Sequence, residues 1–265
     1  MWYWLNDEQM KKIRFELNPP KTVQNRYFEE HELRRSLSSL VTRANQLVGL
    51  VDGIHITDSV LGVPRISGIS LAHFIRRAGN NLPISCSVRA RDRNYTSFMQ
   101  FVGDAILLGL DSILILKGDE LGPDSSTSNL KPTEILRVLQ SEKYDRYIHF
   151  SLAVPSKAKD KIQVEKKILS GAHSLVTQSI ESLADLGELA DLAKLHGTRI
   201  VACIMIPSEK NLKSAQMIGL DWSEYSLDPV SFIIEANKIA DEVLLTSPNH
   251  FAAAIEVLRV IANQT

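Results

Sequence analysis

Eight short apolar segments, each followed by a longer stretch of helical periodicity, most constrain the fold of this 265-residue chain. The segments are rich in Val, Ile and Leu and almost continuously hydrophobic, which is typical of parallel strands buried on both faces. Strands that alternate with helices indicate a parallel α/β fold. We expect strands at Ile13–Leu17, Gly53–Ile56, Ile84–Arg89, Ser112–Leu116, Ile148–Val154, Ser174–Thr177, Ile200–Ile206 and Val243–Leu245.

The number of βα units favours a closed (β/α)8 TIM barrel over an open doubly wound sheet, because such a barrel typically has about 250 residues. The turn after the first strand reads ELNPPKT rather than a glycine-rich phosphate turn, and no G-x-G-x-x-G or G-x-x-x-x-G-K-[ST] motif occurs. We predict one barrel domain over residues 1–265. Helices are expected at Glu30–Val48, Leu71–Arg77, Ser97–Leu108, Pro132–Gln140, Lys159–Leu169, Leu183–Leu195, Leu212–Met217, Pro229–Ala240 and about Asn249–Ile261.

Charge and composition exclude several classes of protein. With 30 Lys and Arg against 31 Asp and Glu, the chain has no basic excess for nucleic-acid binding. No apolar run approaches the ~20 residues of a membrane span, and the first residues lack the pattern of a signal peptide. The two cysteines, Cys86 and Cys203, are too few for a disulfide framework, and the histidines lack metal-ligand spacing. We therefore expect a cytoplasmic protein without a membrane segment or metal centre.

The carboxyl ends of barrel strands are where chemistry is expected, and Glu16 is the most informative residue there. Alternation in the segment IRFEL places Phe15 and Leu17 on one face and Arg14 and Glu16 on the other. A carboxylate that faces the lumen is costly unless it is paired. Glu16 is therefore either one half of an ion pair, with Arg14 or a lysine, or a working acid.

Other polar residues also follow expected strands. Asp119 comes after SILILKG, where it is either a functional acid or a turn aspartate at the start of the surface loop Gly118–Lys131. Gln178 ends the segment SLVTQ. Its side-chain amide either forms paired hydrogen bonds with a heterocyclic ligand or hydrogen-bonds to a backbone group in the lumen. Lys166 and Lys167 belong either to a solvated helix face or to an anion site, and Arg91 lies in the basic cluster RARDRN.

Four motifs in order along the chain resemble the methylenetetrahydrofolate reductase family. FELNPPKT at Phe15–Thr22 is similar to its opening F-E-F-F-P-P-K-T strand, and LKGD at Leu116–Asp119 to its L-x-G-D signature. SGAHSLVTQ at Ser170–Gln178 is similar to A-G-A…I-T-Q, and IPSEKNLKSA at Ile206–Ala215 to a proline turn followed by N-F-K. The segment RDRN at Arg91–Asn94 is similar to the third strand of some family branches.

The resemblance implies a flavin-dependent oxidoreductase of one-carbon and methionine metabolism. Reduced FAD would transfer hydride to 5,10-methylene-tetrahydrofolate, or a related tetrahydropterin, and form the 5-methyl product. Glu16 would be the general acid, and Asp119 the second catalytic residue. The resemblance places at the FAD Thr57, Ser87, Arg91, Asp119, Lys166 and Lys167. It places at the pterin Glu16, Asp119, Gln178 and Leu212.

Three departures from the family pattern accompany the resemblance. Ser87 stands where a histidine is common, and Leu212 where the family has a phenylalanine. The segment LLTSPNH at Leu244–His250 replaces an aromatic residue and an arginine that contact folate in the family. The resemblance implies NAD(P)H or another electron donor, and a homo-oligomer or a protein electron-transfer partner is possible. Two alternatives stay open on the same barrel. One is a flavin-free pterin methyltransferase, and the other is a non-redox subunit that binds pterin or a partner.

Overall fold

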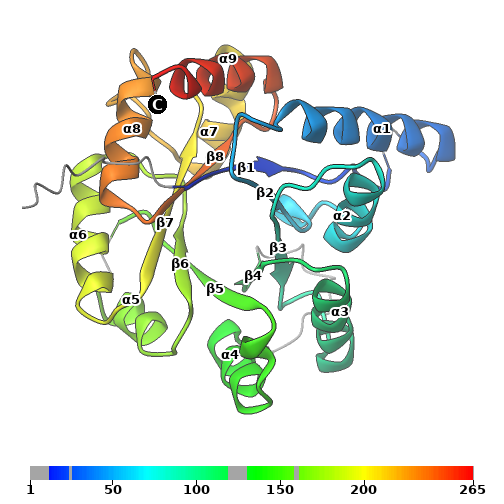
Figure 1. The fold of residues 1–265 in the computed structure, drawn as a ribbon, viewed down its shortest axis with the longest axis horizontal. Coiled ribbons are helices and arrows are strands. Elements are labelled where there is room, and N and C mark those ends of the chain that lie inside the picture. Colours follow the sequence, from blue (N-terminus) through cyan, green and yellow to red (C-terminus); the bar gives the residue numbers. More distant parts are fainter. Residues whose placement is uncertain (1–11, 24–25, 119–129, 158–160, 265) are drawn as a thin grey trace, which may run out of the picture.

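The computed structural model describes residues 12–23, 26–118, 130–157 and 161–264. Eight parallel strands form a closed barrel in the order β1 to β8, and β8 pairs back to β1 (Figure 1). This confirms the predicted (β/α)8 barrel, and most strand ends differ from prediction by no more than one residue. The strands are β1 Lys12–Leu17, β2 Gly53–Ile56, β3 Ile84–Arg89, β4 Ser112–Leu116, β5 His149–Val154, β6 Ser174–Thr177, β7 Arg199–Met205 and β8 Glu242–Thr246.

Capping side chains mark the start of some of the helices. α2 starts at Gly68, earlier than predicted, because the Ser67 hydroxyl accepts a hydrogen bond of 3.1 Å from the Ser70 amide. The helices are α1 Glu30–Gln46, α2 Gly68–Arg77, α3 Tyr95–Leu107, α4 Pro132–Ser141, α5 Lys161–Ile168, α6 Leu183–Lys194, α7 Leu212–Ile218, α8 Pro229–Ile239 and α9 Phe251–Ala262. Within the described ranges, none of them combines the length and hydrophobicity that crossing a bilayer requires.

The two faces of each strand pack against different surroundings. Outward side chains join one continuous core with the helices; Phe15, for example, packs edge-on against Phe251 of α9 with ring centroids 5.7 Å apart. Inward side chains fill the lumen, whose middle layer is the small apolar cluster Leu114, Val176, Val201, Cys203 and Leu244. Phe15 and Glu16 therefore lie on opposite faces of β1, as the alternation predicted.

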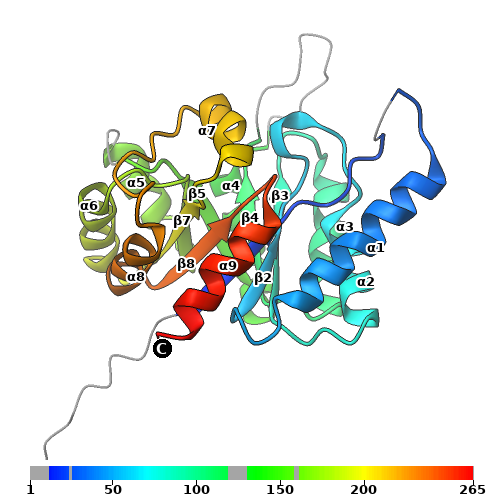
Figure 2. The ribbon, with the colours of Figure 1, turned by 90° about the horizontal axis from the view of Figure 1, so that it is seen from above.

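Helix α7 differs from the helices that surround the barrel. It lies at the end of the barrel where the strands finish, outside the ring of the other helices (Figures 1 and 2). Only Ala215 of this helix is buried. The Asn211 amide, fully buried just before α7, donates to the Ile206 carbonyl (2.9 Å) and to the Ser247 hydroxyl (2.8 Å). Polar contacts at its first residues thus attach α7 to the barrel.

Candidate functional site

The main cavity opens at the carboxyl ends of the strands and has a volume of about 1250 Å³. Residues of all eight strands, or of the turns directly after them, line its wall. Its floor is the apolar cluster of the lumen, including Leu114, Val176, Cys203 and Leu244. The position agrees with the mouth at which enzymes of this fold carry their active sites.

Glu16 lines this cavity from β1 and is surrounded by protein, although its side chain keeps some exposure to the cavity. One carboxylate oxygen accepts a hydrogen bond of 2.7 Å from the Thr246 hydroxyl of β8. Burial raises the pKa of Glu16, while the Thr246 hydrogen bond and the nearby Arg65 charge only partly oppose this effect. Glu16 is thus a carboxyl whose protonated form is favoured and which a ligand in the cavity can reach.

Arg14, the expected ion-pair partner of Glu16, lies deeper in the lumen and pairs elsewhere. Its guanidinium forms a bidentate ion pair with Asp111 and a second one, of 2.8 Å, with Glu242. The predicted alternative of an Arg14–Glu16 pair is therefore wrong. Asp111 and Glu242 lie at the amino ends of β4 and β8, so this network closes the barrel opposite the cavity.

His55 connects the ion network to the cavity floor. Its Nδ1 is 2.9 Å from the Ser85 hydroxyl and its Nε2 is 2.8 Å from the Ser87 hydroxyl. Ser85 donates to the Ile54 carbonyl, so we assign the imidazole proton to Nδ1 and the Ser87 hydroxyl as donor to Nε2. Burial, and secondly the Arg14 charge, lowers the pKa of His55 to about 3. The ring is therefore neutral and acts as a fixed polar bridge.

Among the described residues, basic side chains outnumber acidic ones in the lining of the cavity. The anionic lining residues are Glu16, Asp58 and Glu134. Two of these three form ion pairs, since Asp58 lies 3.5 Å from Arg93 and Glu134 lies 2.9 Å from Lys131. The cationic lining residues are Arg89, Arg91, Lys117, Lys131, Lys166 and Lys167.

The basic segment after β3 is partly structural. Arg89 is almost fully buried, pairs with Asp92 and donates to the Ser59 carbonyl. A Cβ atom on Gly118, whose φ is +92°, would approach the Arg89 guanidinium to 3.0 Å. Gly118 therefore allows the turn after β4 to lie directly against Arg89. Arg91 also lines the cavity, and its amide donates to the Lys117 carbonyl.

Most of the site residues predicted from sequence meet around the cavity. Thr57 is buried and donates a hydrogen bond of 2.8 Å to Asn18, whereas Gln178 exposes its side chain at the cavity edge. Leu212 does not belong to the lining as far as the structure describes it, and it is 47% exposed on α7. Asp119 and most of the Gly118–Lys131 loop lie outside the described residues. The predicted residues that line the cavity are Glu16, Thr57, Ser87, Arg91, Lys166, Lys167 and Gln178.

Residues of the site that were not predicted from sequence include His55, Cys203 and Thr246. His55 carries a recognisable signal, since it is a polar residue inside the buried strand GIHI, like Glu16 in IRFEL. Thr246 lies one residue beyond the predicted end of its strand, and its contact with Glu16 joins residues 230 positions apart. Cys203 reads as an ordinary apolar strand residue, so nothing in the local sequence marks it.

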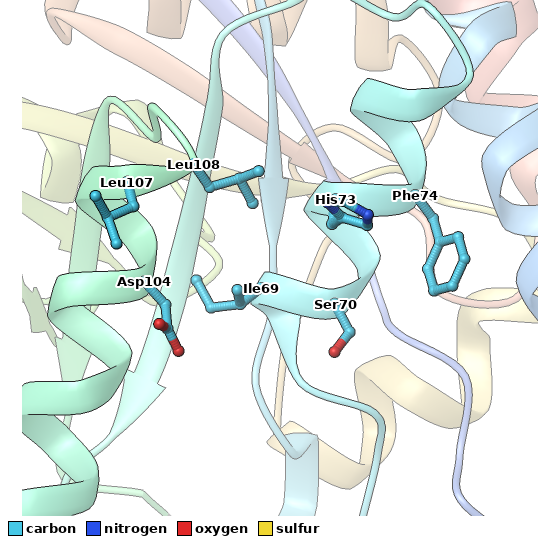
Figure 3. A pocket seen from close by; sticks show the side chains of 7 residues that line it. All are labelled: Ile69, Ser70, His73, Phe74, Asp104, Leu107 and Leu108. Carbon is cyan, nitrogen blue, oxygen red and sulfur yellow. The ribbon is translucent and has the colours of Figure 1, made fainter.

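A shallower groove lies on the outside of the barrel between α2 and α3. It has a volume of about 430 Å³ and is mostly apolar, with Ile69, Phe74 and Leu107 along it (Figure 3). Its two titratable side chains, His73 and Asp104, come from different helices, and Figure 3 shows them apart. The groove therefore lacks a group of converging polar side chains, and the strand-end cavity is the better candidate site.

One group of possible metal ligands occurs in the described part of the chain. Glu29, His31 and Glu32 lie together at the start of α1 and are mostly exposed. His31 Nε2 is already 3.4 Å from Glu29 and 3.3 Å from Glu32. The group has no contact that indicates a bound ion, so it is a surface cluster of charged side chains.

Comparison with known proteins supports the fold and nothing finer. No family model and no curated protein sequence matches the chain. Among solved structures, KGPDC from Streptococcus mutans is 12% identical with a TM-score of 0.53, over 97% of this chain and 99% of that one. Tryptophan synthase from M. tuberculosis is also 12% identical with a TM-score of 0.53, over 96% of this chain and 91% of that one. A protein from Aquifex aeolicus VF5 is 11% identical with a TM-score of 0.54, over 98% of this chain and 92% of that one.

These comparisons overturn the predicted relationship to methylenetetrahydrofolate reductase. The similar structures are other barrel proteins, and no match in sequence supports that family. The predicted flavin-dependent reduction of a methylene-tetrahydropterin is therefore wrong as well. The FAD and electron-donor predictions depended on that resemblance and stay untested. What the comparisons establish is a (β/α)8 barrel.

Proposed function

We propose that this protein is an enzyme that binds a small organic anion in the strand-end cavity and uses Glu16 as a general acid. The observation that carries the proposal is the environment of Glu16. Its carboxyl group faces a large open cavity while burial favours its protonated form. A carboxylic acid that can be reached from a cavity and has a raised pKa is suited to donate a proton to a bound substrate.

The charge around the cavity supports an anionic substrate. Among the described lining residues, six are basic and three are acidic, which favours a positive potential at the opening. Lys117 and Lys166 expose their side chains there, so they are available to a ligand from solvent. The apolar floor would contact the uncharged part of the same ligand. The proposed substrate therefore has an anionic end and an apolar body.

Thr246 would position the acid. Its hydroxyl donates to one Glu16 oxygen, so the carboxyl group is held in one orientation and its other oxygen remains for a substrate. Acid catalysis depends on such positioning as much as on the pKa.

The proposal is tested with the wild-type protein and two glutamate variants. A mixture of phosphorylated and carboxylated metabolites is incubated with each protein, and mass spectrometry follows which compounds are consumed. We expect Glu16→Gln to abolish consumption and to keep anion binding, measured as thermal stabilisation by the consumed compound. Glu134→Gln is the matched control, because Glu134 also lines the cavity but is paired with Lys131. Undiminished turnover by Glu16→Gln would disprove the role of this residue.

A further inference from the structure

Lys167 differs from every other lysine around the cavity in how its amine is held. It lies on α5, and its half-buried side chain reaches β5, where Nζ donates a hydrogen bond of 2.6 Å to the Ala153 carbonyl. Ala153 itself lines the cavity and packs against the apolar cluster of the lumen. The neighbouring Lys166 also lines the cavity but is exposed. Lys167 thus presents its amine next to an apolar cavity wall.

No carboxylate of the described residues forms an ion pair with Lys167. Its hydrogen-bond acceptor is an uncharged carbonyl, which accepts a hydrogen bond from a neutral amine as well as from an ammonium group. Burial lowers the pKa of Lys167, which favours the neutral amine. When one N–H of that amine bonds to Ala153, the nitrogen lone pair is left for a reaction partner in the cavity.

We propose that Lys167 is an amine nucleophile that forms a Schiff base with an aldehyde or ketone group of the substrate. This inference rests on the proposed function, because it takes the cavity as the place where an anionic substrate binds. It adds the substrate class, a carbonyl compound that also carries an anionic group. Desolvated lysines in apolar pockets are the ones that react in this way.

The reaction is balanced without a further reagent. The lone pair of Nζ attacks the carbonyl carbon and forms a carbinolamine, and water moves the proton from nitrogen to oxygen. The C–O bond then breaks, and the carbonyl oxygen leaves as water with both hydrogens of the amine. A C=N bond replaces the C=O bond, and no atom is oxidised or reduced.

The barrel places Lys167 and Glu16 on facing walls of the cavity. Glu16 is on β1, and the Lys167 amine is fixed to β5, four strands further in a closed barrel of eight (Figure 1). A substrate held by its imine at β5 therefore extends toward the acid on β1. The exposed Lys166 and Lys117 lie at the same opening as the Lys167 amine, where they can contact the anionic group.

The test uses glyoxylate, an aldehyde small enough to enter the cavity with a carboxylate beside its carbonyl group. The full-length protein is incubated with glyoxylate and sodium borohydride, which reduces an imine to a stable amine, and peptide mass spectrometry locates the label. We expect Lys167 to be labelled first, about tenfold faster than the exposed Lys166, because burial favours the neutral, nucleophilic form of the Lys167 amine. Lys167→Met should remove this label, and Lys194→Met, a control at an exposed lysine of α6 outside the described cavity lining, should retain it.

Two outcomes would overturn the inference. One is labelling of Lys166 or Lys117 at the rate of Lys167, and the other is the absence of label on Lys167 at saturating glyoxylate. Circular dichroism of Lys167→Met checks that the variant is folded; if it is not, the labelling rates of Lys167 and Lys166 in the wild-type protein still decide. Thermal stabilisation by anions without borohydride is measured in parallel. If anions stabilise the protein thermally but Lys167 is not labelled, only the Schiff base is refuted. If there is neither thermal stabilisation nor a label on Lys167, the anion site is refuted as well.

Discussion

The two ends of the barrel lumen hold charged groups in opposite ways. At the amino ends of the strands, the Arg14 guanidinium is bonded to both Asp111 and Glu242. At the carboxyl ends, Glu16 has one hydroxyl partner, and Lys167 has one carbonyl partner. Charges bonded to each other in a buried network are costly to separate, whereas groups with spare bonding capacity can act on a ligand. The lumen at the amino ends of the strands, its lower end, is thus a structural plug. The lumen at the carboxyl ends, its upper end, is the candidate active site.

The largest expected effect tests the lower end. Arg14→Met leaves the buried Glu242 and the partly exposed Asp111 without their cation, so we expect a loss of about 3 kcal/mol in the free energy of unfolding. Urea denaturation measures it. Arg34→Met is the control, because Arg34 forms an exposed pair with Glu30 at 2.6 Å and should cost less than about 0.5 kcal/mol. Equal losses in both variants would contradict the view of a structural plug.

The second prediction concerns His55, which lies between the two ends. The pKa of His55 falls from 6.5 to about 3 in the folded protein, so the unfolded chain takes up the proton first on acidification. Stability should therefore fall as the pH drops below 6.5, by up to about 1.4 kcal/mol for each pH unit. Urea denaturation between pH 6.5 and 4.5 should show a weaker pH dependence for His55→Gln. Parallel curves for both proteins would mean that His55 does not cause the dependence.

The third prediction tests the upper end through Glu16. Its ordinary pKa is 4.5 and the folded value is raised, so above pH 4.5 the unfolded chain loses the proton while the folded protein keeps it. The wild type should therefore lose stability relative to Glu16→Gln as the pH rises above 4.5. The difference between the two unfolding free energies, measured as a function of pH, checks this. If the unfolding free energy of the wild type instead rose relative to that of Glu16→Gln with increasing pH, Glu16 would be ionised in the folded protein and would stabilise it.

The smallest effect is expected from Thr246→Val. This change removes one hydrogen bond and should cost about 1 kcal/mol of unfolding free energy. Because the Thr246 hydrogen bond lowers the pKa of Glu16, its loss should raise that pKa further. Infrared difference spectra of the carboxyl band, with Glu16→Gln as the reference, follow the titration. An unchanged titration would show that Thr246 does not interact with the ionised form.

Local patterns predicted the fold well, because each strand and helix has a characteristic sequence pattern within a few residues. Continuous Val, Ile and Leu segments predicted the strands, and alternation in IRFEL placed Glu16 in the lumen. The partners of the lumen charges could not be predicted in this way. Asp111 lies 97 residues from Arg14, and their pairing depends on how eight strands close into one barrel.

The predicted family was wrong for a related reason. Every parallel barrel places polar and turn-forming residues at the carboxyl ends of its strands, as in FELNPP, LKGD and LVTQ here. Short motifs at these positions report the architecture more directly than the chemistry. Leu212 illustrates the limit, since its motif assigned it to the substrate, yet it is 47% exposed on α7 and outside the described cavity lining.

The attachment of α7 also has a consequence for how this protein can diverge. Almost none of this helix is buried, and the amide of Asn211 fastens its start to β7 and to the segment after β8. Replacement of the residues after Asn211 would leave the apolar core of the barrel intact. Evolution, or a designer, could therefore exchange this segment near the opening of the candidate site for another and alter what the cavity binds while the scaffold keeps its stability.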